Sequence, residues 1–188
     1  MEGAPQHITT NRLILRPPGR GDRRLWVTLY RDPSLWQHEA WAMAASDADA
    51  GHSFAECLER WERAGFDYGV VEETSTRKGI GVGGLSLRAA PSGEEVLDLD
   101  YRLTAPAHGR GLATEAVRAW TAHALEWLPD LPVVASCREA NTRSVRTAVS
   151  AGLEVVGTVD DAPGDEPPSR LLRAPRVEAA GSFDAQTR

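Results

Sequence analysis

The residues best suited to chemistry lie in a loop at residues 108–113, between an apolar strand pattern and a long helix pattern. In chain order the loop contains His108, Gly109, Arg110, Gly111, Leu112 and Ala113. A glycine loop that opens a helix leaves backbone N–H groups without acceptors, and the helix dipole adds partial positive charge there. The loop therefore predicts a binding site for an anion such as a pyrophosphate. A structural turn before an ordinary amphipathic helix is the alternative that the glycine spacing leaves open.

Two carboxylates precede the loop on one side of the predicted strand. Asp98 and Asp100 are two positions apart, so in a strand both side chains point the same way. A carboxylate in a cleft can accept a proton from an amine or hold an ammonium group. A solvated strand face is the alternative for both residues.

The stretch from Asp98 to Ala116, together with the Asn141-x-x-Ser144 pattern, resembles the acetyl-CoA-binding motifs of the GNAT N-acetyltransferase superfamily. The glycine loop is similar to that family's Gln/Arg-x-x-Gly-x-Gly/Ala pyrophosphate loop, with His108 at the usual Gln/Arg position. The preceding Asp-Leu-Asp-Tyr-Arg-Leu looks most like the branch that acetylates N-terminal amines of ribosomal proteins. The resemblance implies an α+β fold: a central, mostly antiparallel sheet with splayed parallel strands, flanked by helices.

By this resemblance the donor is acetyl-CoA, held between two splayed strands at residues 98–103 and 133–137. The 108–113 loop would bind its pyrophosphate, and Arg110 would add a charge. The backbone of Leu103 would pair with the pantetheine arm, while Asn141 would hold the arm from the other side. The resemblance implies no metal.

The resemblance also implies direct attack of a primary amine on the thioester in a ternary complex. Asp98 matches the family's acidic residue in this strand and is the candidate base or acceptor anchor, with Asp100 as the second candidate. An α-amine with a pKa of about 8 is already partly neutral at pH 7, so a strong base is needed only for a lysine-like amine. The family's usual tyrosine acid is replaced by Ala148, and the hydroxyl of Ser144 is expected to stabilise the departing sulfur.

The acceptor side is expected to involve residues 34–43, which lie between the first two predicted helices. In GNAT enzymes this segment lines the acceptor pocket. Its candidate substrate-binding residues are Trp36, His38, Glu39 and Trp41. Ordinary packing of each tryptophan in the core is the alternative.

The other elements are predicted from hydrophobic periodicity and turn residues. Strands are expected over residues 7–16, 66–73, 80–88, 94–103, 133–137, 153–157 and 170–175, and helices over 22–30, 46–64, 112–128 and 141–151. Three successive strands on short turns predict an antiparallel meander, and a strand, a crossover helix and a strand predict one parallel pair. The proline-rich stretch after Asp160 departs from the closing hairpin of the family.

Composition sets the broad class. The length of 188 residues predicts one domain, which by the resemblance is an acetyltransferase domain over residues 1–175, followed by a disordered tail over residues 176–188. The net charge of -6 argues against a nucleic-acid partner and is compatible with a cationic acceptor or simply with solubility. The two cysteines lack metal-ligand spacing, which predicts free thiols. The sequence has no basic leader and no long apolar run, which predicts a cytoplasmic protein without a membrane partner. A homodimer is an open possibility.

Three other functions compete with the transferase hypothesis. A dinucleotide-binding oxidoreductase also uses a glycine loop at a strand-to-helix junction, but Thr114 fills the place of its third glycine and an antiparallel meander comes first. A nucleotide kinase would need a Gly-Lys-Ser/Thr motif, which the sequence lacks. A non-catalytic protein that binds acetyl-CoA as a sensor or scaffold is the remaining alternative.

Overall fold

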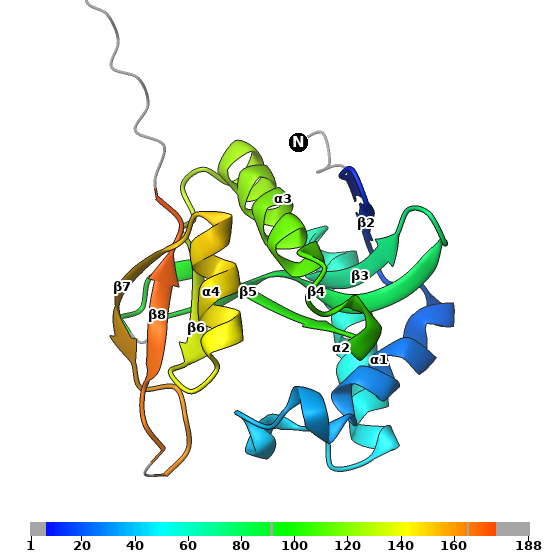
Figure 1. The fold of residues 1–188 in the computed structure, drawn as a ribbon, viewed down its shortest axis with the longest axis horizontal. Coiled ribbons are helices and arrows are strands. Elements are labelled where there is room, and N and C mark those ends of the chain that lie inside the picture. Colours follow the sequence, from blue (N-terminus) through cyan, green and yellow to red (C-terminus); the bar gives the residue numbers. More distant parts are fainter. Residues whose placement is uncertain (1–6, 91, 165, 176–188) are drawn as a thin grey trace, which may run out of the picture.

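A computed structural model describes residues 7–90, 92–164 and 166–175, and an eight-stranded mixed sheet forms the centre of this part of the chain (Figure 1). The strands are β1 (Ile8–Thr9), β2 (Leu13–Arg16), β3 (Tyr68–Glu73), β4 (Lys78–Ala89), β5 (Glu95–Leu103), β6 (Val133–Arg138), β7 (Glu154–Val159) and β8 (Ser169–Arg173). Their order in the sheet is β1-β2-β3-β4-β5-β6-β8-β7. Among these strands only β5 and β6 run parallel.

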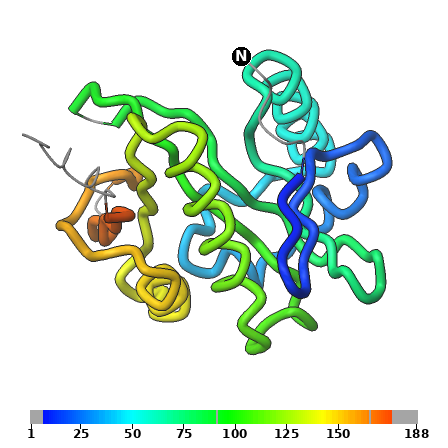
Figure 2. The backbone as a smooth tube through the Cα atoms, turned by 90° about the horizontal axis from the view of Figure 1, so that it is seen from above, coloured from blue at the N-terminus to red at the C-terminus, as the bar shows by residue number. Residues whose placement is uncertain are grey.

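Helices cover both faces of the sheet (Figures 1 and 2). They are α1 (Arg23–Tyr30), α2 (Asp47–Ala64), α3 (Leu112–Trp127) and α4 (Thr142–Ala151). Buried residues of α1 and α2 form one apolar cluster with Tyr68 and Val82, and those of α3 and α4 form another with the opposite side of the sheet. This arrangement confirms the predicted α+β fold, because each amphipathic helix buries its apolar stripe against one sheet face.

Strand β5 separates the two faces residue by residue. Leu97, Leu99 and Leu103 pack in the core beneath α3 and α4. The alternate positions, Asp98 and Asp100, therefore point to the face that carries α1 and α2. The two carboxylates therefore share one face of the strand, as predicted, because the leucines are buried on the other face.

The first predicted strand is a hairpin instead of one continuous element. Strands β1 and β2 pair antiparallel, with Ile8 opposite Leu15. Thr10 turns the chain, because its hydroxyl and amide both contact the carbonyl oxygen of Leu13 and the hydroxyl also accepts a hydrogen bond from the Leu13 amide. A polar stretch within residues 7–16 thus folds back on itself, which the run of apolar residues alone did not indicate.

Glu115 in the first turn of α3 fastens this hairpin to the helix. Its carboxylate accepts hydrogen bonds from the Thr10 hydroxyl at 2.6 Å, the Arg12 amide at 2.9 Å and the Arg12 Nε at 2.7 Å. An acidic group at this position also complements the helix dipole. The N-terminal hairpin is therefore held against the helix that follows the glycine loop.

Replacing Glu115 with Gln is expected to lower the free energy of unfolding by about 1–2 kcal/mol at pH 7. Burial alone would raise the pKa of Glu115, but the hydrogen bonds from Thr10 and Arg12 outweigh it and lower the pKa. A carboxylate with a lowered folded-state pKa contributes stability above its unfolded pKa and loses that contribution as the pH falls through the folded value. Urea denaturation should therefore show the difference from the original protein shrinking below about pH 4.3. Glu126→Gln, on an exposed position of the same helix, serves as the control; an equal loss there would contradict the assignment.

The C-terminal strands correct the expectation drawn from the proline-rich stretch. Strands β7 and β8 form an antiparallel hairpin, with Val159 opposite Ser169, and β8 also pairs with β6. The closing hairpin is therefore present, and the predicted tail at residues 176–188 lies outside the described residues. The end of the domain at residue 175 stays a prediction.

Within residues 7–90, 92–164 and 166–175, no helix combines the length and the apolar character needed to cross a membrane. Both cysteines, Cys57 and Cys137, are buried free thiols, as predicted. Burial raises the pKa of Cys137 to about 11, so its thiolate is disfavoured at neutral pH.

Candidate functional site

The parallel strands β5 and β6 separate soon after they meet. Their pairing consists of Leu97 opposite Val133 and Asp98 opposite Val134. From Val134 onward β6 pairs with β8 on its other side, while β5 continues to Leu103 beside β4. The predicted splay is therefore present, and an opening between the two strands begins directly after Asp98.

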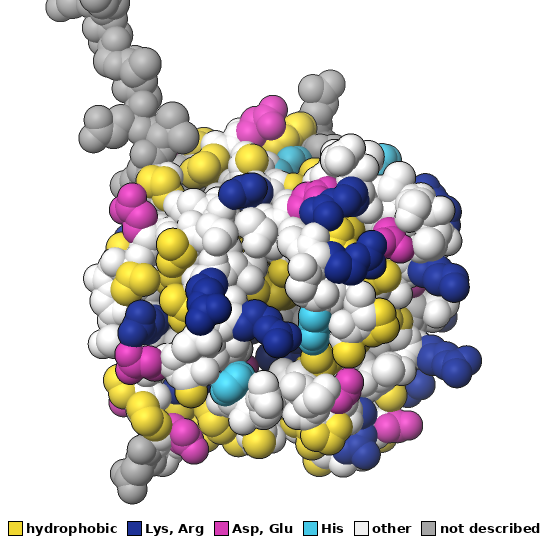
Figure 3. Space-filling model, in the orientation of Figure 1, with side chains coloured by type: hydrophobic (Ala, Val, Ile, Leu, Met, Phe, Trp, Pro, Cys, Tyr) yellow, Lys and Arg dark blue, Asp and Glu magenta, His cyan; other side chains and the backbone are white. Residues whose placement is uncertain are grey.

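A cavity of about 290 Å³ lies at the wide end of this opening. It is lined by the end of β5, the start of α4, His108 and a short segment before α2: Ser34, Leu35, Gln37, His38, Tyr101, Arg102, Leu103, His108, Ala140, Asn141, Thr142, Arg143 and Ser144. Figure 3 shows a hollow in the middle of the face of the molecule drawn there, with basic and histidine side chains at its rim. The structure thus brings Leu103 and His38 together with Asn141 and Ser144, which the sequence placed on three separate elements.

The glycine loop leads into α3 with an exposed backbone. Gly109 and Gly111 have φ of 72° and 74°, which residues other than glycine rarely adopt. Gly111 is the N-cap of α3, and the Glu115 amide donates to its carbonyl oxygen at 3.1 Å. The amides of the three residues before Glu115 therefore have no partner four residues back within the helix. A Cβ atom added at Gly109 would meet nothing within 4 Å, so the loop surface is open to a ligand.

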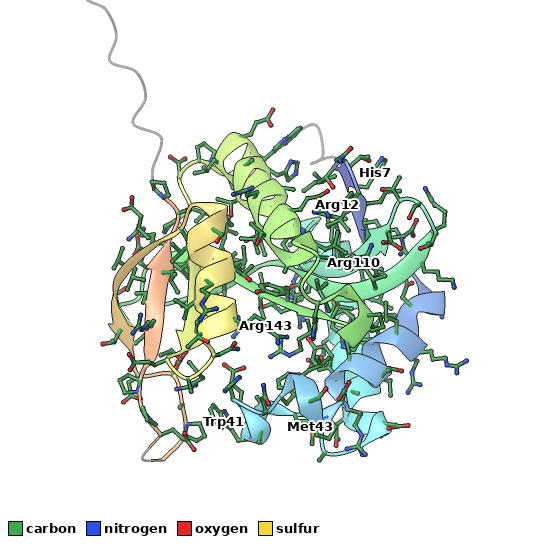
Figure 4. The ribbon with its side chains drawn as sticks, viewed as in Figure 1. His7, Arg12, Trp41, Met43, Arg110 and Arg143 are labelled. Atoms are coloured by element: carbon green, nitrogen blue, oxygen red, sulfur yellow. The ribbon has the colours of Figure 1, made fainter. Side chains whose placement is uncertain are left out.

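Arg110 is not an unpaired charge in this loop. Its guanidinium pairs with Glu73, and its carbonyl oxygen accepts a hydrogen bond from Arg12 at 2.9 Å (Figure 4). The positive character of the loop therefore comes mainly from backbone amides and the helix terminus.

A second cavity of about 370 Å³ lies beside the loop, between the start of α3 and α4. Hydroxyl and guanidinium groups line it: Thr114, Thr142, Arg143, Arg146, Thr147 and Ser150. Arg143 borders both cavities, at the end of α4 that faces the opening (Figure 4). Hydroxyls, two arginines and a helix N-terminus are groups that bind phosphate, so the residues fit the nucleotide end of acetyl-CoA.

Ser144 and Asn141 are fixed at the start of α4. The Ser144 amide donates to Asn141 Oδ1 at 3.1 Å, so the asparagine carbonyl caps the helix and its side-chain amide keeps its donors. The Cys137 thiol donates to Ser144 Oγ at 3.4 Å. Tyr101 forms side-chain hydrogen bonds with Thr147 and with Ser144. Burial raises the pKa of Tyr101, and these two hydrogen bonds oppose the rise. The sequence offered no sign of this tyrosine's proximity to Ser144.

The segment at residues 34–43 is attached to the sheet by two arginines that the sequence analysis missed. Arg102 on β5 lies over the Trp36 ring, 3.6 Å from its centroid, and pairs with Asp100 and with Glu39 at 3.4 Å. Arg138 on β6 lies over the Trp41 ring at 4.8 Å.

The same carboxylate lies between the two arginines. Glu39 Oε1 is 4.0 Å from Arg138 Nε, and Asp161 pairs with Arg138 at 3.0 Å. Burial raises the pKa of Glu39, and Asp100 adds to the rise, while Arg102 and Arg138 oppose it. Trp36, Glu39 and Trp41 therefore hold the segment in place, and His38 is the one of the four candidates that lines the described cavity.

Asp98 lies two residues from Asp100 on the same strand face and outside the lining of both cavities. Its Oδ2 is 3.0 Å from Arg88 Nε and accepts a hydrogen bond from the Tyr68 hydroxyl at 3.2 Å. Burial raises the pKa of Asp98, and the nearby Arg88 offsets part of the rise. A raised pKa makes a carboxylate a better proton acceptor than an ordinary aspartate.

No group of three or more histidine, cysteine, aspartate or glutamate side chains capable of holding a metal ion occurs among the residues that the structure describes.

The sequence profile of the acetyltransferase (GNAT) domain family matches residues 12–154 of the chain. No curated protein matches it in sequence. The matched range contains both strands of the splay, the glycine loop and the start of α4.

Solved structures with a similar fold include acetyltransferases of different substrates. A protein described as a GNAT-family acetyltransferase from Bordetella pertussis is 22% identical, with a TM-score of 0.74 over 90% of this chain and 99% of that one. The ribosomal-protein-S5-alanine acetyltransferase from Vibrio fischeri is 15% identical, with a TM-score of 0.67 over 92% and 97% of the two chains. MccE, the microcin C7 self-immunity acetyltransferase solved with acetyl-CoA and AMP, is 16% identical, with a TM-score of 0.69 over 90% and 96%. At these identities the likeness concerns the fold.

Proposed function

Because the chain belongs to the GNAT acetyltransferase family, we propose that it transfers an acetyl group from acetyl-CoA to a primary amine by direct attack in a ternary complex. The observation that carries the proposal is the opening between β5 and β6, which connects the glycine loop to a cavity lined by Asn141, Ser144 and His38. We propose a peptide N-terminus or a small amine as the acceptor.

The donor site is proposed to use backbone groups and the start of α4. The amides of residues 109–113 would bind the pyrophosphate, and Leu103 and Asn141 would hold the pantetheine arm. Acetyl-CoA supplies the activated acetyl thioester. The residues of the opening would hold both reactants in one orientation, which can account for several kcal/mol of the barrier before any acid or base acts.

The acceptor site is proposed to lie on the face of β5 that carries Asp98 and Asp100. His38, at the rim of the cavity, would contact the acceptor, while Trp36, Glu39 and Trp41 keep its segment against the sheet. Asp98 would take the proton from the amine, and the Ser144 hydroxyl would donate toward the departing sulfur. A thiol with a pKa near 8.5 is a good leaving group, so this hydroxyl gives moderate help.

Turnover is the direct test of the proposal. The purified protein is incubated with acetyl-CoA and single amines, starting with peptides that bear free serine or alanine N-termini, and released thiol is measured together with acetylated product. Acetylated product with any amine supports the transferase. Saturable acetyl-CoA binding without product across peptide, polyamine and aminoglycoside acceptors would favour the sensor or scaffold function.

An Asp98→Asn variant is expected to have a kcat/KM about tenfold lower for a peptide α-amine at pH 7, because only about a tenth of such an amine is neutral without a proton acceptor. The deficit should be larger for a lysine-like amine and should shrink as the pH approaches the pKa of the acceptor. Asp130→Asn, in the exposed turn after α3, is the control. An unchanged kcat/KM at every pH would remove Asp98 from the mechanism.

A further inference from the structure

The imidazole of His108 lies between β5 and α4, with a partner on each ring nitrogen. Nε2 is 2.8 Å from the carbonyl oxygen of Leu103, and Nδ1 is 3.1 Å from a terminal nitrogen of Arg143. A guanidinium only donates hydrogen bonds, so Nδ1 must be the acceptor. Nε2 therefore carries the proton and donates to Leu103, which fixes a neutral tautomer of the ring.

This hydrogen bond occupies a backbone group at the wide end of the splay. Pairing between β5 and β6 ends at Asp98 and Val134, so β6 supplies no partner at the level of Leu103. Leu103, His108 and Arg143 all line the 290 Å³ cavity. The side chain of the loop thus satisfies a carbonyl that lies in the proposed donor site.

We propose that His108 is a latch on the donor site, which the pantetheine arm must displace from the Leu103 carbonyl in order to bind. The proposal rests on the proposed function, which assigns the Leu103 backbone to that arm. An amide N–H of the arm and the imidazole N–H are both donors, so they compete for the same oxygen. Displacement also removes the Nδ1 acceptor from Arg143.

The surroundings allow the ring to move. Gly109, the next residue, has a positive φ, and a Cβ atom placed there would contact nothing within 4 Å, so no packing at this position opposes a movement of the His108 ring. Ala107, the residue before it, is buried and anchors the other side. Arg143 also lines the second cavity with Arg146. Once released, its guanidinium can turn toward a phosphate there, which couples arm binding to nucleotide binding.

The test compares acetyl-CoA affinity in His108→Ala, in the original protein and in the matched control His52→Ala, whose side chain is exposed on α2. Calorimetric titration should give a dissociation constant roughly three- to tenfold lower in His108→Ala. This change corresponds to the net free energy of one hydrogen bond, which no longer has to be broken before the arm binds. The control should bind as the original protein does. An equal or weaker affinity in His108→Ala would overturn the latch.

Ring NMR of the original protein gives a second readout that does not depend on an affinity difference between variants. Long-range 1H–15N spectra, with the His108 signals assigned by their loss in His108→Ala, should show the Nε2–H tautomer in the free protein and a change in both ring nitrogens at saturating acetyl-CoA. Unchanged ring signals with saturable binding would overturn the latch and leave the donor site intact. Absence of saturable binding in all three proteins would overturn the proposed function and the latch with it.

Discussion

Gly111→Asp is expected to weaken acetyl-CoA binding at least about a hundredfold, whereas Gly111→Asn should retain most of the affinity. Both side chains have nearly the same size, and both residues tolerate the positive φ of 74° found at this position better than other non-glycine residues do. Only the aspartate places a negative charge beside the amides proposed to bind the pyrophosphate. A like charge about 5 Å from a phosphate group costs about 3 kcal/mol at an effective dielectric constant near 20.

Calorimetric titration measures both variants, and thermal unfolding checks that each is folded. A Cβ atom at Gly111 would have the Arg12 guanidinium as its nearest neighbour at 3.7 Å, so neither side chain is expected to disrupt packing. Equal losses in the two variants would mean that the glycine conformation matters and the charge does not. Unchanged affinity in Gly111→Asp would remove the loop from the donor site.

Arg102→Met is expected to lower the free energy of unfolding by about 3 kcal/mol. Arg102 is almost fully buried and pairs with Asp100 and Glu39 while covering the ring of Trp36. Both carboxylates are half-buried, so removing the guanidinium leaves two partly desolvated charges uncompensated, which costs more than the pairs themselves contribute. Methionine keeps much of the apolar contact with the ring. Urea denaturation measures the loss.

A double variant separates charge from packing in this result. Arg102→Met with Asp100→Leu should recover part of the stability, because it removes the nearest uncompensated carboxylate. Arg24→Met, an exposed arginine at the start of α1, is the single-site control. A loss below 1 kcal/mol in Arg102→Met would contradict the assignment of Arg102 as the attachment between residues 34–43 and β5.

The sequence indicated those parts of the fold that depend on local pattern. Apolar residues every four positions placed α3, and the second helix was predicted to begin at residue 46, where the Ser46 hydroxyl caps α2 by accepting the Asp49 amide at 3.1 Å. Turn residues between apolar runs gave the meander β3–β5. These features are determined by neighbours in the chain, so a single sequence contains them.

The contacts that shape the site join residues distant in the chain, and a single sequence does not encode their geometry. Glu39 forms an ion pair with Arg138, and Tyr101 forms a hydrogen bond with Ser144. The alternation of Asp100 and Arg102 on one strand face was the one available sign of a charge network there. His108 was identified only as the first residue of the pyrophosphate loop, but its ring makes the notable contact, because the direction of a loop side chain depends on the fold around it.

The most direct test of the central claim is calorimetric titration of the protein with acetyl-CoA, alongside an identical titration with a nicotinamide dinucleotide. Acetyl-CoA should bind saturably at one site per chain, and the dinucleotide should give no saturable heat, because the opening beside the glycine loop is proposed to hold a pantetheine arm. Saturable binding of the dinucleotide alone would contradict the account.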